Sequence, residues 1–380
     1  MSRLIISSIC EDGTMAADTR FYPLTIAEVR PETETAVCIN FTVPDELRET
    51  FRFIQGQFLT LKTLINGEEV RRSYSICSGV HDERLQVGIK RVRGGKFSNH
   101  ANDHFKVGDV VEVMPPQGSF HSPLDASHAK RYMCLAAGSG ITPILSIIKT
   151  ILVEEPLSQV TLIYGNRRSN SVMFKEELGF LKNRYLTRLQ WINIMSEEDQ
   201  GTDLLNGIID NAKGTALHKS RLINIKAADE VFICGPEAMM SEVSRGFRAV
   251  GFTDERIHYE LFANSSADAA TLLEKSQQRI DTYGEEKTSK VTVIVDGRAL
   301  QFELATVGQN ILDAGIRNGM ELPYACKAGV CSTCKAKLVK GQVDMDIHHG
   351  LEAHEIAAGY ILTCQAHPVS DEVVVDFDQR

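Results

Sequence analysis

The stretch PYACKAGVCSTCKAKL, residues 323–338, decides how the chain is interpreted, because it places three cysteines within nine residues. Four residues separate Cys326 from Cys331, two separate Cys331 from Cys334, and Cys364 follows after a further 29. Structural zinc sites usually pair their ligands as two short C-x2–4-C hooks. That is not the arrangement here, although zinc and four unrelated buried cysteines remain the alternatives.

The order C-x4-C-x2-C followed by a distant cysteine is the ligand pattern of plant-type 2Fe-2S clusters. A loop around such a cluster also has to bring its backbone N–H groups close to the sulfur atoms. Small residues permit that approach, and they occur here at Ala325, Ala328, Gly329, Ser332 and Thr333. Spacing and loop composition together predict a 2Fe-2S cluster with the ligands Cys326, Cys331, Cys334 and Cys364.

The region around these cysteines, residues 291–380, resembles a plant-type ferredoxin domain in ILDAGIRNGMELPYACKAGVCSTCKAKLVKG and AAGYILTCQAHP. The resemblance implies a β-grasp fold that carries one electron at a time. The stretch VTVIVDGRALQFELA, with Asp-Gly at its centre, predicts a hairpin that opens this domain. The preceding residues 263–290 are polar and rich in small side chains, so we expect an interdomain linker that includes one helical turn.

Residues from about 20 to 125 form short apolar or alternating stretches separated by Gly, Asp and Pro, which predicts an antiparallel barrel. Within RRSYSICS, Arg72, Tyr74 and Ser75 could offer a flavin a phosphate-binding cation, an aromatic face and a hydroxyl. Within GIKRVRGGKFSNH, Gly94, Gly95 and Ser98 could hold a phosphate. Taken alone, these stretches are equally typical of ordinary strand packing and a hairpin turn.

In this order, RSYS, GIKRVRGGKFS and PPQGSF resemble the flavin-binding barrel of the ferredoxin–NADP reductase superfamily. A subgroup of that superfamily binds FMN and also carries a C-terminal ferredoxin domain, but it typically lacks the Pro-x-Gly-x-Phe form found here. The resemblance therefore implies FAD rather than FMN. Carried over to this chain, the flavin contacts are Arg72, Tyr74, Ser75, Lys90, Gly95, Lys96, Ser98 and Gly118.

Residues 131–262 alternate strand-like and helical stretches, which predicts a doubly wound parallel sheet. In CLAAGSGITPILSI, Gly138 belongs to a turn, Thr142 is a candidate helix cap and Pro143 a candidate first helical residue. The partner stretch ICGPEAMM ends a later strand, and ligands of such sheets bind beyond these strand ends. We therefore expect Gly138 and Thr142 to face Cys234 and Gly235.

In the superfamily, these two motifs hold the nicotinamide nucleotide and the cysteine lies beside the nicotinamide ring, which implies that role for Cys234 here. The closing acidic-x-aromatic pattern of the family matches Glu260 and Phe262. Ser75, Cys234 and Glu260 are accordingly the expected catalytic residues.

Arg167 and Arg168 follow the strand VTLIYGN and predict a 2′-phosphate site, hence NADPH. An exposed arginine pair is as often a solvated turn, and relatives commonly have an arginine where Ile208 stands.

We expect an FAD-binding barrel at 18–126, an NAD(P)H-binding α/β domain at 127–262, a linker at 263–290 and a ferredoxin domain at 291–380. NAD(P)H gives up two electrons together, whereas a 2Fe-2S cluster accepts one, and a flavin can do both. No carboxylate–histidine di-iron pattern occurs, and His348-His349 is typical of a solvated loop. The final acceptor is therefore expected to be another protein.

The domain order resembles the reductase components of bacterial multicomponent oxygenases. The C-terminal region most resembles the reductases of phenylacetyl-CoA ring epoxidase systems, which implies a di-iron oxygenase component as partner and a role in phenylacetate catabolism. Reductases of steroid-ring hydroxylases are the alternative. A non-enzymatic redox sensor is a third interpretation, which a complete set of cofactor sites disfavours.

Composition and charge exclude several other classes of protein. The net charge of −9 over 380 residues, without a basic patch, argues against nucleic acid as a partner. No run of 18 apolar residues is present, so we expect no membrane span. Nine unevenly spaced cysteines do not form a disulfide framework, and the N-terminal stretch, in which Met15 is a second candidate start, does not resemble a signal peptide. The expected compartment is the cytoplasm.

Overall fold

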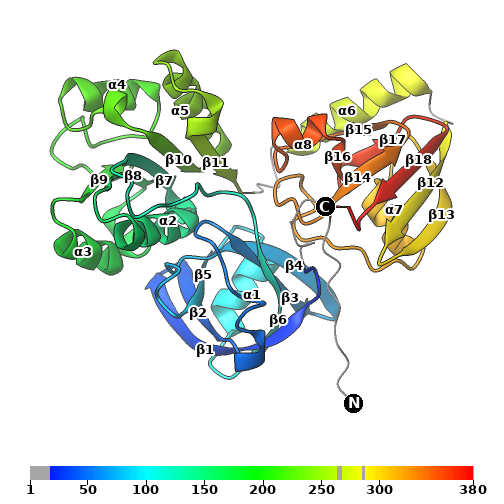
Figure 1. The fold of residues 1–380 in the computed structure, drawn as a ribbon, viewed down its shortest axis with the longest axis horizontal. Coiled ribbons are helices and arrows are strands. Elements are labelled where there is room, and N and C mark those ends of the chain that lie inside the picture. The colour runs from blue at the N-terminus through cyan, green and yellow to red at the C-terminus, as the bar shows by residue number, and fades with distance from the viewer. Residues whose placement is uncertain (1–17, 263–267, 285–286, 380) are drawn as a thin grey trace. The chain divides into compact units, whose positions relative to one another are not determined.

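A computed structural model describes residues 18–262, 268–284 and 287–379. The chain divides into two compact units, of which the first spans Phe21–Phe262 and the second contains the described residues from Asp268 on. Each unit is described by itself below (Figure 1). Expectations about Met15 and the N-terminal stretch fall outside the described residues.

The first unit begins with an antiparallel sheet of six strands in the order β4-β3-β6-β1-β2-β5. The edge strands β4 and β5 meet through an isolated bridge between Ile76 and Val87, which brings the sheet round into a barrel. Helix α1 follows β5. The predicted antiparallel barrel is confirmed. Its elements are β1 (Tyr22–Thr33), β2 (Ala36–Thr42), β3 (Phe58–Ile65), β4 (Glu68–Ser75), β5 (Leu85–Lys90), α1 (Lys96–His104) and β6 (Val110–Gln117).

The same unit continues with a parallel five-stranded sheet in the order β11-β10-β7-β8-β9. Helices α2 and α3 contribute to the core on one face, whereas α4 and α5 contribute to the core on the other (Figure 1). The predicted doubly wound sheet is confirmed. Its elements are β7 (Arg131–Ala137), α2 (Ile141–Glu154), β8 (Gln159–Asn166), α3 (Lys175–Arg184), β9 (Leu189–Met195), α4 (Asn211–Lys219), β10 (Glu230–Gly235), α5 (Glu237–Ala249) and β11 (Ile257–Leu261).

Helix α2 is apolar almost all round, and eleven of its fourteen residues are buried. It is buried on several sides because one core combines its residues with Cys38, Cys77 and Phe120 from the barrel region and with strands β7, β8 and β10. The start of this helix differs from expectation. Gly140 is the N-cap, and Thr142 and Pro143 lie inside the first turn. The hydroxyl of Thr142 donates back to the Ser139 carbonyl at 3.0 Å, so it does not cap the helix.

The second unit is built on a mixed sheet of five strands in the order β13-β12-β18-β14-β16, with β15 and β17 paired beside it. The Asp296-Gly297 turn has φ values of 50° and 69°, which is the geometry of a tight hairpin. The expected hairpin and β-grasp sheet are thus present. The elements are α6 (Asp268–Tyr283), β12 (Thr288–Val295), β13 (Arg298–Ala305), α7 (Ile311–Arg317), β14 (Lys335–Lys340), β15 (Val343–Met345), α8 (Ala353–Ala357), β16 (Tyr360–Leu362), β17 (Ala366–Pro368) and β18 (Glu372–Asp376).

Helix α6 corrects the expectation that residues 263–290 form a linker with one helical turn. It has 16 residues and belongs to the second unit. The sequence of this segment lacks a sustained apolar stripe. In the structure, Arg279 of α6 is buried and ion-paired, so a buried charge adds to the apolar packing of the helix. Among the described residues, no helix has the length and apolar character needed to cross a bilayer.

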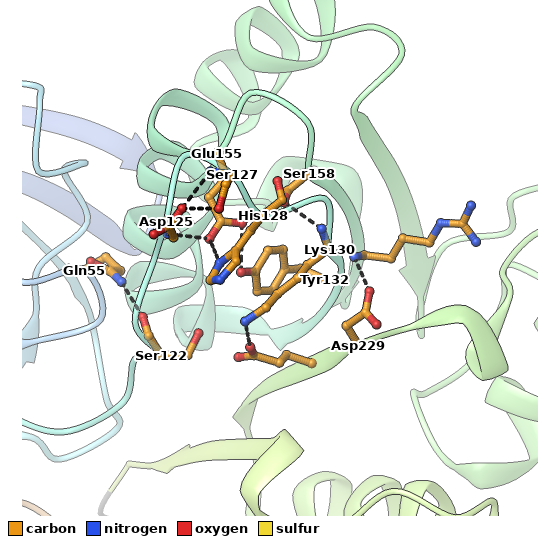
Figure 2. Close-up of polar contacts among 12 residues, drawn as sticks. Gln55, Ser122, Asp125, Ser127, His128, Lys130, Tyr132, Glu155, Ser158 and Asp229 are labelled. Carbon is orange, nitrogen blue, oxygen red and sulfur yellow. Dashed lines mark hydrogen bonds and ion pairs between the residues drawn. The ribbon is translucent and has the colours of Figure 1, made fainter.

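A buried carboxylate joins several segments at the N-terminal edge of the parallel sheet (Figure 2). The side chain of Glu155, just after α2, is fully buried and accepts hydrogen bonds from Tyr132 Oη at 2.9 Å and Ser158 Oγ at 2.7 Å. It also contacts His128 Nδ1 at 2.7 Å and accepts from the Asp125 N–H at 3.1 Å. Burial alone would raise the pKa of Glu155, but these bonds hold it below the usual value.

We expect Glu155→Gln to destabilise the first unit by about 3–5 kcal/mol, because the amide leaves buried donors without a charged acceptor. Trp191, the single tryptophan of the chain, lies in β9, so its fluorescence during urea titration reports on this sheet. Glu154→Gln is the matched control. Its partner His81 is exposed, and the loss should stay within about 1 kcal/mol. Equal midpoints for the two variants would contradict the assigned role of Glu155.

Candidate functional site

The end of strand β4 carries the side chains expected to face a flavin. Tyr74 packs its ring against Phe97 of α1, with centroids 5.5 Å apart and tilted by 44°. Ser75 is buried, and its Oγ donates to Glu260 Oε2 at 2.8 Å. Arg72 is exposed. The structure therefore brings together Ser75 and Glu260, two expected catalytic residues 185 positions apart in the sequence.

Glu260 lies in β11 and retains partial exposure, but protein atoms surround its carboxyl group closely enough to change its ionisation. Burial raises the pKa of Glu260 to about 7, and the hydrogen bond from Ser75 opposes that rise. A carboxyl group with such a pKa can hold or release a proton near neutral pH. This is the range in which a group at a redox centre is useful as a proton reservoir.

The expected phosphate turn lies at the start of α1. Gly94 has φ of 73°, and Gly95 is the N-cap of the helix, whose first turn has no side-chain cap among the described residues. A Cβ atom on Gly95 would come within 2.6 Å of Ser98 Oγ, which itself accepts a hydrogen bond from the Val92 N–H. The uncapped amides of this nine-residue helix can bind an anion.

Two other expected flavin contacts, Lys96 and Gly118, interact with other residues of the barrel. Lys96 donates to Glu68 at 2.7 Å, and both side chains are exposed. Gly118 has φ of 114°, and a Cβ atom there would approach the Phe58 ring to 3.0 Å. Gly118 thus has a backbone reason for being glycine, whether or not a flavin lies nearby.

The expected nucleotide turn packs directly against the end of β10. A Cβ atom on Gly140 would lie 2.1 Å from the Cys234 carbonyl oxygen, so a side chain cannot be accommodated there. A Cβ atom on Gly235 would lie 3.1 Å from Ala137 Cβ. The structure thus brings the two motifs together at the C-terminal edge of the parallel sheet, the edge at which such sheets bind ligands.

Positive charge gathers at the same turn. Gly138 has φ of 55°, and a Cβ atom there would lie 3.6 Å from Lys90 Nζ. Burial and the nearby Arg167 lower the pKa of Lys90. Tyr164 Oη donates to the Gly138 carbonyl at 2.9 Å and steadies the turn. Lys90 from the barrel and Arg167 from the parallel sheet therefore bring two cations to this turn.

Cys234 is fully buried, and its register partner in the neighbouring strand is Glu260. Burial, reinforced by the charge of Glu260, raises the pKa of the Cys234 thiol well above its ordinary value. The group is therefore a neutral thiol that fills space at the strand end. Phe262 packs, partly buried, against the same core.

Arg167 and Arg168 are both exposed, and each lies near the carboxylate of Glu197, at 3.6 Å and 3.5 Å. Sequence reasoning missed Glu197, because the stretch SEEDQ resembles an exposed acidic loop. A bound phosphate would compete with Glu197 for the arginines, and exposed pairs of this kind are weak. The structure therefore leaves the pair available to an anion.

Three of the four expected ligands lie in one loop, residues 323–334, here called the cluster loop, and Cys364 follows β16. The four cysteines approach one another as the pairs Cys326–Cys331 and Cys334–Cys364. A hydrogen bond from Cys326 lowers the pKa of Cys331, while the same contact raises that of Cys326. Hydrogen bonding to Cys334 and burial raise the pKa of Cys364. Within the described residues no group of three His, Cys, Asp or Glu converges on a single metal position. Two pairs suit a binuclear cluster, in which each iron takes two protein ligands.

The backbone of this loop also fits a cluster. The Ala328 N–H donates to Cys326 Sγ at 3.3 Å, and the Cys326 N–H donates to Cys331 Sγ at 3.5 Å. Gly329 has φ of 72°, and a Cβ atom there would come within 2.7 Å of the Ile347 carbonyl oxygen. N–H groups that already point at sulfur are what a thiolate-bound cluster requires. His348 and His349 are exposed, as expected for a solvated loop.

Comparison with known protein families gives three matches. Residues 24–122 match the oxidoreductase FAD-binding domain, residues 134–245 the oxidoreductase NAD-binding domain, and residues 293–369 the 2Fe-2S iron-sulfur cluster binding domain. These matches confirm the predicted FAD, NAD(P)H and 2Fe-2S domains.

The similarity to individual relatives extends over almost the whole chain. A subunit of the 1,2-phenylacetyl-CoA epoxidase of Escherichia coli K12 is 47% identical over 95% of this chain and 99% of its own length. The ferredoxin reductase component of a Rhodococcus rhodochrous 3-ketosteroid-9-alpha-monooxygenase is 34% identical over 93% of this chain and 96% of its own.

Among solved structures, a phthalate dioxygenase reductase has the same modular fold. Its TM-score is 0.56 at 24% identity, and the match covers 94% of this chain and 98% of that one.

We expect Cys331→Ser to remove the iron–sulfur absorption and EPR signal while the flavin stays bound, because the cysteine and the flavin-binding barrel lie in different units. Reduction of a flavin-reactive dye by NADPH should persist, whereas reduction of cytochrome c should fall sharply. Cys134→Ala, which alters a buried cysteine in the first unit, is the control and should keep the cluster. A Cys331→Ser protein with the full iron–sulfur spectrum would refute the ligand assignment.

Proposed function

The chain belongs to the family of FAD- and NAD(P)H-dependent 2Fe-2S reductases that serve multicomponent oxygenases, and on that premise we propose that its acceptor is the di-iron component of a phenylacetyl-CoA epoxidase. The observation that carries this proposal is the near full-length similarity to the Escherichia coli epoxidase protein. The steroid monooxygenase reductases are less similar over a comparable length, and they define the second candidate. We also propose a cytoplasmic location, where the described cysteines, none of which forms a disulfide, would stay reduced.

As a reductase component, the protein transfers electrons from NAD(P)H through FAD and the 2Fe-2S cluster to an oxygenase. The bound flavin supplies the conversion of one two-electron transfer into two one-electron transfers. The residues of the chain would hold the cofactors, exclude water from them and bind or release a proton beside the flavin. Tyr74 would cover a face of the isoalloxazine ring, and Arg72 and the α1 amides would hold phosphate.

Ser75 and Glu260 are proposed to act as a pair. The Ser75 hydroxyl is fixed by its bond to Glu260, so its position relative to the flavin ring is set by two different strands. Glu260, with a pKa of about 7, would hold a proton when the pH falls below that value and would release it above that value, where the carboxylate accepts from Ser75 at Oε2. Cys234, a buried neutral thiol, would limit the space beside the nicotinamide and make no proton transfer.

We propose NADPH as the preferred coenzyme. Arg167 and Arg168 follow β8, and Lys90 lies at the neighbouring glycine turn, so a nucleotide in this place would meet three cations. The 2′-phosphate of NADPH is the additional anion that exposed arginines at this strand end can accommodate. Glu197 is the group that the phosphate would displace from the arginines.

Replacing both Arg167 and Arg168 by alanine should raise the KM for NADPH roughly ten- to a hundred-fold, since a charged hydrogen bond contributes about 1.5–3 kcal/mol. The KM for NADH should change little. Glu197→Gln is the matched control. It removes the competing carboxylate and should leave the KM for NADPH unchanged or lower. A double variant that weakens NADH and NADPH equally would show that the arginines are structural.

Charge in the cluster domain supports a transient protein partner. Residues 291–380 contain 12 acidic and 7 basic residues, so they carry −5 of the net charge of −9. Charges of one sign around a redox centre speed the encounter with a surface of the opposite sign without requiring tight binding. The proposed oxygenase component would accordingly offer a basic docking surface.

Electron delivery to the oxygenase should slow as ionic strength rises, because salt screens attraction between exposed charges. Hydride transfer from NADPH to flavin should change much less, and stopped-flow absorbance can follow both steps in one preparation. A salt-independent oxygenase step would contradict charged docking. With purified oxygenases, support of phenylacetyl-CoA epoxidation is expected. Absence of that activity together with support of steroid hydroxylation would establish the second candidate.

A further inference from the structure

Helix α6 contains a buried arginine that the cofactor assignments leave without a role. The side chain of Arg279 is 3% exposed, and the helix lies outside residues 293–369, which match the cluster-binding domain. Its guanidinium pairs with Asp344 at 3.0 Å and also with Asp346, whose side chain is 9% exposed. Buried ions are retained in proteins when they are paired, and breaking such a pair is costly.

Two further contacts extend this ion pair into a network. His367 Nε2 lies 3.0 Å from Asp346 Oδ2, and both side chains are buried. Lys275, one turn before Arg279 on α6, donates to the Met345 carbonyl at 3.3 Å. Strands β15 and β17 pair Asp344 with His367 and Met345 with Ala366, so the network crosses both strands of this small ladder. Helix α6 therefore holds the β15–β17 ladder in place.

The segment that follows β15 is the support of the cluster loop. The Ile347 carbonyl oxygen approaches Gly329 so closely that a Cβ atom there would be 2.7 Å away. The Gly350 N–H donates to the Gly329 carbonyl at 2.8 Å, and Ser332 Oγ donates to the Gly350 carbonyl at 2.8 Å. Ile347 directly follows Asp346, the partner of Arg279. A chain of direct contacts thus runs from α6 to the residues on both sides of Cys331.

A cavity of about 280 Å³ places the same arginine near a second cluster ligand. Its lining includes Arg279, Asp346 and His367 together with Cys364 and Gln365. Arg279 Nε and His367 Nδ1 are buried and have no hydrogen-bond partner among the described residues. Arg279 and Cys364 therefore line the same cavity, together with a second cationic residue, Lys327.

We propose that Arg279 is a positioning residue of the iron–sulfur cluster, and that α6 is an integral brace of the cluster loop through the Arg279–Asp346–His367 network. The network fixes the 343–350 segment, and that segment fixes the backbone N–H groups that point at the cysteine sulfurs. Hydrogen bonds to sulfur and nearby charge set the potential and the accessibility of such clusters. This inference uses the cysteine ligand set and does not depend on which oxygenase is the acceptor.

The test uses the full-length holoenzyme with the variant Arg279→Gln. Loss of the cluster absorption in the presence of an iron chelator should be roughly ten-fold faster, because a charge-assisted contact that holds the loop is lost. The midpoint potential of the cluster should shift to a more negative value, since a buried positive charge near Cys364 disappears. The cluster EPR g-values should change. Reduction of ferricyanide by NADPH through the flavin should stay at the level of the unmodified protein.

Three companion variants separate positioning from general damage. Arg298→Gln removes an exposed arginine of the same unit and should leave the bleaching rate, potential and g-values unchanged. Arg279→Lys keeps the charge but loses the planar fork, so its potential should stay near that of the unmodified protein while bleaching is intermediate. Asp344→Asn removes the partly exposed partner and should accelerate bleaching by about three-fold, with a potential shift of the opposite sign to that of Arg279→Gln.

The proposal is overturned if Arg279→Gln and Arg298→Gln bleach at the same rate with identical potentials and g-values. If Arg279→Gln cannot be isolated with its cluster, Asp344→Asn decides the question. Accelerated bleaching in that variant supports the brace, and an unchanged rate overturns it.

Discussion

The first unit depends on one hydrophobic core that the flavin-binding barrel and the parallel sheet share through helix α2. Phe120 and Cys38 from the barrel region enter this core beside the apolar residues of α2. The fit is close, since a Cβ atom on Gly88 of β5 would lie 2.7 Å from Thr142 Cγ2. Protein cores are packed as densely as organic crystals and resist sliding. The two cofactor-binding domains are therefore held in one arrangement, and Ser75 can meet Glu260 across them.

That rigidity matters because a hydride moves between two atoms that must nearly touch. Productive geometries place reacting atoms about 3–3.5 Å apart, and a misplacement of about 1 Å can cost a hundred-fold in rate. Electron transfer from flavin to cluster forms no bond, and its geometric demand is weaker. The cluster unit accordingly has a separate core of its own, around Val291, Leu312 and Val373, and its own means of holding the cysteine loop. The flavin and nucleotide sites are thus held by one shared core, whereas the cysteine ligands are held by the core of the second unit.

Sequence reasoning predicts the features that local patterns encode. The cysteine spacing, the strand–helix alternation and the Asp-Gly hairpin are short-range signals, and the structure has the corresponding elements. The local pattern favours Thr142 as the cap of α2, but Gly140 occupies that position because its backbone passes so close to the Cys234 carbonyl that a Cβ atom would lie 2.1 Å from the oxygen. Likewise, α6 depends on an ion pair between Arg279 and residues more than 60 positions later. Contacts between distant segments leave no periodic trace in a single sequence.

The same long-range pairing changes how the charge of the cluster unit should be understood. Asp344 and Asp346 count toward the net −5 of residues 291–380, but Arg279, which lies outside that range, pairs with both. Arg279 therefore offsets one of these two negative charges inside the unit, so the field that a partner meets is weaker than the count of −5 implies. Exposed acids such as Glu303, Glu321 and Asp371 remain on the surface. An approaching oxygenase would respond to these surface groups, whereas the buried Asp346 belongs to the network proposed to support the cluster loop. The acidic residues of this unit thus fall into two groups, surface acids that a partner meets and an ion-paired buried acid. A count of charges in the sequence does not distinguish them.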